Sequence, residues 1–465
     1  MLHHFGKFRR PVALVMLSVF LVAQLLLPLT ARAFFFGGVS LKDEKEMGHK
    51  FDVAIRSSLP MVDDPEVSKY VDGLVIPPQP FTFTSGVILH NAMNAFAIPG
   101  GHVYVFTGLI MNFEDESQLA GVLSHELAHV TQRHVASRLE RAQYLSVGSL
   151  LLAIAGVAVG GPAGGAVAVG ALGAGQSAML NYSRLDENEA DQIGLQYLTK
   201  AGYPPSGLVG GFKIMRQKSW MAGASVPAYL STHPDIGDRI NGIQARLSSF
   251  PASIRNRTFD NRRFKRVQTV LWGRYGDSQA ALQRFSGKDA LSCMGRGMVL
   301  SRRNNVREAA AAFDQALQLA PKDPLVLREA GTFHYRKGDM ARAEGLLRQA
   351  MQLDKNDFMA RFFYARMLDE TGRAQQAQPY YTEVLRAVPE AADVHEAYAR
   401  SLGSIGKTGL AYIHMAYSAI YSNNRKLAER YFKQAKAKTE KSADSAAFRK
   451  LDAVYKERKE IWEDR

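Results

Sequence analysis

The sequence of 465 residues predicts two folds in succession. The first is a mainly helical α+β domain with a small sheet, and the second is an all-α superhelix of repeated helical hairpins. Two observations support this prediction. The segment His125–His129 places two histidines on one face of a helix that follows three short predicted strands. From Ala290 onward, small and aromatic residues recur with a period of about 34 residues.

The first 33 residues have the features of an export signal. Basic residues at positions 7, 9 and 10 precede an apolar stretch at 12–29, and Ala31-Arg32-Ala33 offers an A-x-A cleavage site. We therefore predict a cleaved signal peptide at 1–33 and a periplasmic protein. An uncleaved anchor is the alternative, because the apolar stretch is long for a signal.

The chain is basic, with a net charge of +14 and a single cysteine, Cys293, so no intrachain disulfide can form. A basic surface could attract nucleic acid, but an exported protein rarely meets any, and we expect no nucleic-acid partner. Anionic lipid headgroups or acidic partner surfaces are the expected targets. A solvated basic surface without a partner explains the charge equally well.

Short elements precede the histidine helix. Residues 34 to about 75 have the pattern of helices, and strands are expected at 81–89, 94–98 and 102–106. Pro99-Gly100-Gly101 separates the last two strands as a tight turn. An edge strand of such a sheet can bind an extended peptide by strand addition.

Residues 142–183 carry no charge and are rich in alanine, valine, leucine and glycine. A transmembrane hairpin is one interpretation. Two packed helices with an apolar tip, or a loop that touches membrane or substrate, are the others. We expect at most peripheral membrane contact, because glycines and Pro162 interrupt the apolar run.

The segment His125-Glu126-Leu127-Ala128-His129 is the H-E-x-x-H pattern of zinc peptidases. Two histidines four residues apart can hold one metal ion, and a carboxylate beside the first can reach a water on that ion. Zinc needs a third protein ligand, and the acidic, helix-compatible segment 186–191 provides one. Two histidines and one carboxylate with an open fourth position are the ligand set of a catalytic zinc, one per chain.

The last third of the chain carries the signature of tetratricopeptide repeats, whose stacked hairpins form a superhelix with a concave binding face. Full repeats are expected at about 290–391, with degenerate hairpins on both sides. Three consecutive periods place small, aromatic or large apolar, and turn residues at matching positions. These are Gly297, Ala309, Phe313, Ala316 and Pro321; Gly331, Ala343, Leu347, Ala350 and Lys355; and Ala365, Ala377, Tyr381, Val384 and Pro389.

Both halves together resemble the M48 zinc metallopeptidases, and among them the periplasmic type that couples the peptidase domain to C-terminal tetratricopeptide repeats. The matching motifs are residues 94–101, the pentapeptide at 125–129, Ser183-Arg184 with Glu187-Asn188-Glu189-Ala190-Asp191, and Thr232-His233-Pro234 with Arg239. The resemblance implies a gluzincin metallopeptidase domain at 34–260 and a repeat domain at 261–465.

The resemblance implies His125, His129 and Glu189 as zinc ligands, with Glu187 and Asp186 as alternatives for the acidic ligand. It implies Glu126 as the general base. Three further residues, His233, Arg239 and Asp191, are candidates for supporting roles in the site.

His233 or Arg239 would stabilise the oxyanion of the tetrahedral intermediate. His233 could instead occupy the open zinc position and hold the enzyme inactive, and Arg239 could brace the domain through a salt bridge. Asp191 would orient a ligand histidine.

Two functions compete. The first is a zinc endopeptidase that degrades misassembled outer-membrane proteins and assists their assembly. The second is a chaperone or adaptor for outer-membrane assembly with a mostly self-inhibited protease site. By resemblance, the partners are unfolded or misassembled outer-membrane proteins, and the β-barrel assembly machinery bound through the repeats.

Overall fold

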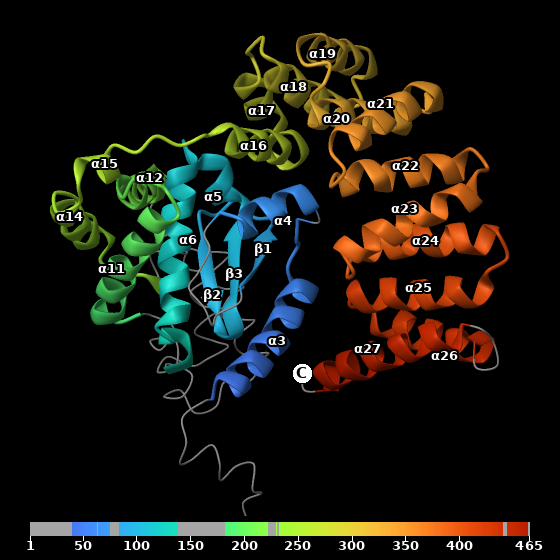
Figure 1. The fold of residues 1–465 in the computed structure, drawn as a ribbon, viewed down its shortest axis with the longest axis horizontal. Coiled ribbons are helices and arrows are strands. Elements are labelled where there is room, and N and C mark those ends of the chain that lie inside the picture. Colours follow the sequence, from blue (N-terminus) through green and yellow to red (C-terminus); the bar gives the residue numbers. More distant parts are fainter. Residues whose placement is uncertain are drawn as a thin grey trace, which may run out of the picture.

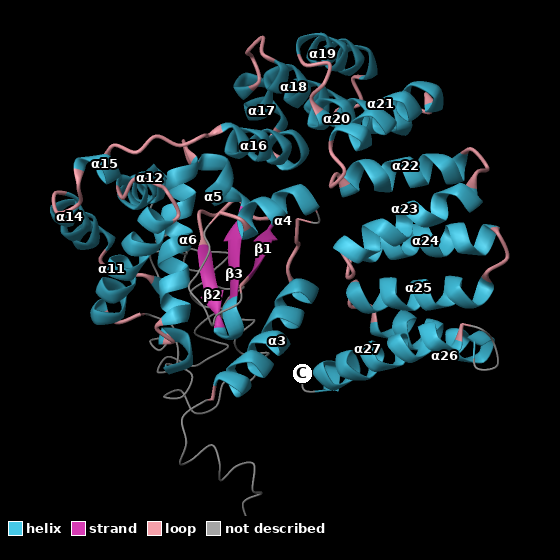
Figure 2. Ribbon diagram, viewed as in Figure 1, coloured by secondary structure: helices cyan, strands magenta, loops and turns pink. Residues whose placement is uncertain are grey.

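The computed structural model describes residues 40–62, 64–74, 83–137, 182–221, 229, 232–439 and 444–463. The expected signal at 1–33 and almost all of the uncharged segment at 142–183 lie outside these residues. Within the described part, none of the helices combines the length and apolar character needed to cross a membrane. The described chain is mainly helical with one small sheet (Figure 2).

The first half of the chain surrounds the sheet with helices (Figure 1). Its helices are α3 (Leu41–Ser58), α4 (Pro65–Asp72), α5 (Thr107–Asn112), α6 (Glu116–Thr131), α11 (Arg184–Lys200), α12 (Ser206–Met221), α14 (Ile236–Leu247) and the short α15 (Ala252–Arg255). Its strands are β1 (Thr84–Ile88), β2 (Ala95–Ile98) and β3 (His102–Phe106), with a short 3₁₀ turn, η1 (Pro99–Gly101).

The three predicted strands are confirmed and form one sheet in the order β1-β3-β2. β1 runs parallel to β3, and β2 runs antiparallel to it, with Ile98 opposite His102. The expected turn between β2 and β3 depends on glycine, since Gly100 and Gly101 have φ angles of 80° and 90°. β2 is therefore an edge strand of this sheet.

Helix α6 is the centre of the first half and lies between the sheet and the helices α11 and α12 (Figure 1). Asp115 caps it by accepting a hydrogen bond from the backbone of Gln118. Small residues bring the neighbouring helices close. A Cβ at Gly194 of α11 would lie 3.1 Å from the backbone of His125, so no larger residue fits without displacement. Ala190, on the same helix, is fully buried.

The second half is a stack of helical hairpins (Figure 1). The expected full repeats are the pairs α18 (Ala290–Arg302) with α19 (Val306–Leu319), α20 (Pro324–Arg336) with α21 (Met340–Leu353), and α22 (Phe358–Glu370) with α23 (Ala374–Ala387). The degenerate hairpins are α16 (Arg262–Tyr275) and α17 (Ser278–Arg284) before them, and α24 (Ala392–Ser404), α25 (Thr408–Tyr421), α26 (Arg425–Thr439) and α27 (Ser445–Glu463) after them.

The repeat signature has a direct packing cause. The small residue of each first helix faces the large residue of the second helix. A Cβ at Gly297 would lie 3.0 Å from the ring of Phe313, and one at Gly331 would lie 2.9 Å from Leu347. Phe313 and Leu347 are buried, so a larger residue at Gly297 or Gly331 would have to displace them.

The two halves contact each other at both ends of the repeat stack. At the near end, Gln268 of α16 donates hydrogen bonds to the carbonyl groups of Ile110 (2.9 Å) and Phe113 (2.7 Å) beside α5. At the far end, His49 of α3 lies 2.6 Å from Glu457 of α27. One hydrophobic core continues from the first half into the first repeats, from Val62 to Phe333. The repeats therefore do not form an independent appendage.

Candidate metal centre

Helix α6 carries three of the predicted site residues, and their side chains lie close together in the interior of the protein. His125, Glu126 and His129 are all fully buried. The Nε2 atoms of His125 and His129 lie 3.0 Å apart, because residues four apart share a helix face. The ring of His129 stacks on Tyr182, with the centroids 3.7 Å apart.

The acidic partner of these histidines is Glu187, in the first turn of α11. Its carboxylate oxygens lie 3.4 Å from His129 Nε2 and 3.5 Å from His125 Nε2. Glu187 is 1% exposed. Burial raises the pKa of this carboxyl, but His233 and Arg239 beside it outweigh burial and hold the pKa well below its ordinary value. Glu187 is therefore an ionised carboxylate that faces both histidines.

Glu189 does not reach this cluster. Its side chain is 52% exposed, and its carboxylate lies 3.2 Å from Nε2 of His134. The physical reason is helix phase. Two residues along a helix turn the side chain by about 200°, so Glu187 and Glu189 point to nearly opposite sides. The structure therefore corrects the choice of Glu189 in favour of Glu187, which is one of the two alternatives; the other, Asp186, caps the start of α11 with Ser183.

His233 supplies a fourth group. It lies just before α14, its Nδ1 atom is 2.9 Å from Glu187 and 3.4 Å from His125 Nε2, and its ring stacks on Tyr229. Ligand atoms of His125, His129, Glu187 and His233 all lie within 4.8 Å of one another. No signal in the sequence marked Tyr182 or Tyr229, because stacking contacts between distant segments leave no local pattern.

The cluster fits a tetrahedral metal ion. Zinc bonds to histidine nitrogen and carboxylate oxygen are about 2.0–2.2 Å long, so ligand atoms around one ion stand roughly 3.3 Å apart. Five of the six pairs among these four side chains have ligand atoms 2.9 to 3.5 Å apart. The donor set of imidazoles and one carboxylate suits zinc and, more broadly, a divalent transition metal.

Glu126 lies beside the cluster but outside it. Both of its carboxylate oxygens are buried and have no hydrogen-bond partner among the described residues. Its Oε1 is 3.6 Å from Nε2 of His233. Burial raises the pKa of Glu126, and this raised pKa suits a group that must accept and return a proton.

Asp191 and Arg239 support the cluster from behind. Asp191 Oδ1 lies 3.0 Å from Nδ1 of His125, which leaves Nε2 of that ring facing the cluster. Arg239 of α14 donates to Asp191 through Nε (2.9 Å) and Nη2 (2.7 Å), and it also pairs with Glu187. Burial raises the pKa of Asp191, but Arg239 outweighs burial and lowers it. Asp191 therefore contacts the side of the His125 ring that faces away from the cluster, and Arg239 forms ion pairs with two carboxylates, those of Asp191 and Glu187.

Comparisons with known proteins agree with this geometry. A family model described as peptidase family M48 matches residues 64–247, and two models described as tetratricopeptide repeat match residues 294–358 and 334–401. The chain is 33% identical over 231 residues to the putative beta-barrel assembly-enhancing protease of Vibrio cholerae serotype O1, which covers 46% of each chain. It is 31% identical over 212 residues to the beta-barrel assembly-enhancing protease of Escherichia coli (strain K12), which covers 42% of each chain.

A third relative, metalloprotease YcaL of Escherichia coli (strain K12), is 32% identical over 167 residues, 35% of this chain and 61% of that protein. The chain spans about half the length of the beta-barrel assembly-enhancing proteases that it matches. The predicted combination of folds is confirmed: the chain carries a peptidase family M48 domain followed by tetratricopeptide repeats.

Proposed function

We propose that this chain is a zinc-dependent endopeptidase. The observation that carries the proposal is that the buried ligand atoms of His125, His129 and Glu187 lie within 4.8 Å of one another, beside a buried Glu126 carboxylate that accepts no hydrogen bond from the described residues. The M48 match and the protease names of the relatives support the same activity.

The reaction follows from the positions of these side chains. A zinc ion held by His125, His129 and Glu187 would lower the pKa of a bound water and polarise the scissile carbonyl. Glu126 accepts the proton of the attacking water and passes it to the leaving amine. Asp191 holds His125 in the tautomer that leaves Nε2 free to bind metal.

The substrate is proposed to bind as an added strand. β2 packs against α6 and pairs with β3 on one side. Among the described strands, no partner occupies its other side, so its backbone groups remain available to an extended peptide. This arrangement favours unfolded polypeptides over compact folded ones.

The proposal is tested with the chain lacking residues 1–33 and its Glu126→Gln variant. We expect both to bind one zinc per chain and only the unchanged protein to cleave casein, an unfolded test protein. Zinc is measured by atomic emission and cleavage by gel electrophoresis. Absence of zinc from both proteins would refute the metal assignment, and cleavage by the variant would refute the role of Glu126.

Replacing Asp191 with asparagine should weaken zinc binding by about 10–100-fold, because the group that orients His125 loses its charge. Competition with a zinc chelator measures the affinity. Asp186→Asn on the same helix is the matched control, since Asp186 contacts Ser183 at the cap and should leave zinc affinity nearly unchanged. Equal effects of the two substitutions would contradict an orienting role for Asp191.

His233 is proposed to fill the fourth metal position at rest and so to restrain the protease. His233→Ala should then raise the rate of casein cleavage several-fold, with zinc still bound through the other three ligands. The competing role, oxyanion stabilisation, predicts the opposite sign, a loss of about 10²–10³-fold in rate. The rate of the His233→Ala variant relative to the unchanged protein therefore decides between the two roles.

The location and partners are part of the proposal. A periplasmic protein exported by the signal at 1–33 would meet outer-membrane proteins, and the names of the relatives refer to β-barrel assembly. The repeats would dock on the assembly machinery or on its substrates. The placement of His233 inside the cluster also favours the second candidate, an assembly adaptor with a restrained protease site. Retained biological activity in Glu126→Gln would identify the adaptor role.

A further inference from the structure

His134 lies against a histidine of the metal cluster, although it is not one of the four side chains of that cluster. It is 6% exposed, and its Nδ1 atom lies 3.0 Å from Nδ1 of His129. On its other side, Nε2 of His134 lies 3.2 Å from a carboxylate oxygen of Glu189. The three side chains therefore form a row that runs from the buried His129 to the half-exposed Glu189.

The backbone brings His134 to this place by ending helix α6. The helix ends at Thr131, and in a continued helix residue 134 would lie about 140° around the axis from His129. Arg133 instead takes a left-handed conformation with a φ of 56°, which is unfavourable for residues other than glycine. The side chain of Arg133 pairs with the buried carboxylate of Glu44 at 2.9 Å. This turn gives His134 a position over His129 that the helix itself would not give it.

The contacts of His134 agree with one arrangement of protons. In a neutral imidazole one nitrogen donates a hydrogen bond and the other accepts one, whereas an ionised carboxylate only accepts. Nε2 of His134 therefore donates to Glu189, and Nδ1 of His134 accepts the N–H of His129 Nδ1. His129 is then left with a lone pair on Nε2, the nitrogen that lies 3.0 Å from His125 Nε2 and 3.4 Å from Glu187.

The reversed arrangement would keep a metal ion away from His129. If His134 donated through Nδ1, the proton of His129 would sit on Nε2, the nitrogen on the side of the cluster. Nε2 of His134 would then face the carboxylate of Glu189 with a lone pair instead of a proton. Because a metal binds only a nitrogen that carries no proton, Glu189 favours the one tautomer of His129 that can be a ligand.

We propose that His134 is a positioning residue that holds His129 in its metal-binding tautomer, and that Glu189 in turn fixes the tautomer of His134. The inference rests on the proposed metal site, but it concerns two residues outside the four-residue cluster. His125 has a carboxylate directly behind it, that of Asp191 at 3.0 Å, whereas His129 reaches its carboxylate through a second histidine. Glu189 thus connects the protein surface to a buried ligand.

The test compares two replacements of His134 in the chain lacking residues 1–33. His134→Asn keeps an acceptor oxygen near the place of Nδ1 but loses the ring, and His134→Phe keeps a ring but loses the acceptor. Competition with a zinc chelator measures the zinc dissociation constant of each protein. We expect His134→Phe to weaken zinc binding about 10–100-fold and His134→Asn to weaken it by less than about fivefold. A role in packing alone predicts the reverse order, because phenylalanine fills the space of the imidazole better than asparagine does.

Tyr197→Phe is the matched control. Tyr197 of α11 donates a hydrogen bond of 3.0 Å to Thr131 at the end of α6, so this variant loses a contact between the same two helices that touches no cluster residue. Its zinc affinity should equal that of the parent protein. Thermal unfolding of the zinc-free proteins is measured in parallel, and all variants should keep a cooperative transition.

Glu189 supplies a second measurement that leaves the buried side chains in place. Glu189→Leu removes the acceptor at the half-exposed end of the row and should weaken zinc binding by about threefold or more. The same substitution should have no further effect in the His134→Phe protein, because the effect of Glu189 passes through His134. A double-mutant cycle of the two substitutions measures this dependence.

Each outcome decides the proposal. Loss of zinc affinity in His134→Phe, its recovery in His134→Asn, and a Glu189→Leu effect that needs His134 would uphold it. Equal zinc affinities of the parent and His134→Phe, weaker binding in His134→Asn than in His134→Phe, or a Glu189→Leu effect that persists without His134 would overturn it. A parent protein that binds no zinc would refute the metal site as well, whereas the other contrary outcomes concern His134 and Glu189 alone.

Discussion

Glu187→Gln should weaken zinc binding by more than about 100-fold and abolish casein cleavage. The amide removes the charge of the one carboxylate that faces both histidines, at 3.4 and 3.5 Å. Even groups that only orient a ligand contribute about 10–100-fold to metal affinity, so loss of a direct ligand should exceed that. Metal content and chelator competition measure the first effect, and gel-based cleavage measures the second.

Glu189→Gln is the matched control, two residues further along the same helix. Its carboxylate contacts His134 at 3.2 Å and is half exposed, so zinc content should stay near one per chain. A modest change in zinc affinity is expected, because His134, which Glu189 contacts, lies 3.0 Å from Nδ1 of His129. Loss of zinc in Glu189→Gln with retention in Glu187→Gln would reverse our assignment and restore the choice made from sequence.

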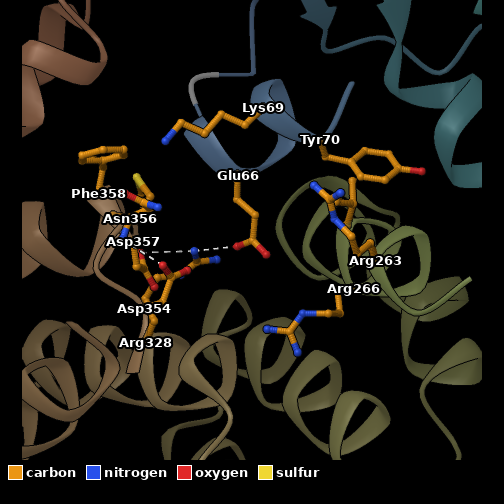
Figure 3. A pocket seen from close by; sticks show the side chains of 12 residues that line it. Glu66, Lys69, Tyr70, Arg263, Arg266, Arg328, Asp354, Asn356, Asp357 and Phe358 are labelled. Atoms are coloured by element: carbon orange, nitrogen blue, oxygen red, sulfur yellow. Dashed lines mark hydrogen bonds and ion pairs between the residues drawn. The ribbon is translucent and has the colours of Figure 1, made fainter. Parts of the chain in front are cut away.

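Arg328→Met should lower the free energy of unfolding by about 3–5 kcal/mol, because it leaves the buried carboxylate of Asp357 without its cation and removes one of the two cations that pair with Glu329. Arg328 is 3% exposed along its side chain and, at the pocket shown in Figure 3, joins Glu66 of the M48 domain to Glu329 and Asp357 of the repeats. We expect this loss of stability to weaken the contact between the two halves of the chain. Denaturant unfolding measures the change in free energy, and limited proteolysis shows whether the repeats separate from the M48 domain first.

The control for Arg328 is Arg400→Met. Arg400 pairs with Glu396 one turn away on α24, and both side chains are exposed. Exposed pairs of this spacing contribute only about 0.3–0.5 kcal/mol, so this variant should unfold almost as the parent does. Similar losses in the two variants would show that burial of Arg328 does not determine its contribution.

Local sequence patterns predict most of the strands and helical hairpins of this fold. The strand at 102–106 was predicted with the bounds that β3 has, and the strands at 81–89 and 94–98 contain β1 and β2. The 34-residue signature located the hairpins because its small and large positions contact each other within one hairpin, as Gly297 and Phe313 do. The bounds of the two domains, 34–260 and 261–465, stay predictions.

The sequence by itself determined the helix that carries His125, Glu126 and His129, since spacing along one helix fixes which side chains share a face. It also determined the repeats, whose contacts are short in sequence. Only the tertiary structure decided between Glu187 and Glu189, because the rotation of α11 depends on how Ala190 and Gly194 pack against α6. It alone placed His233 in the cluster, since this residue comes from a segment that only folding brings to α6 and α11.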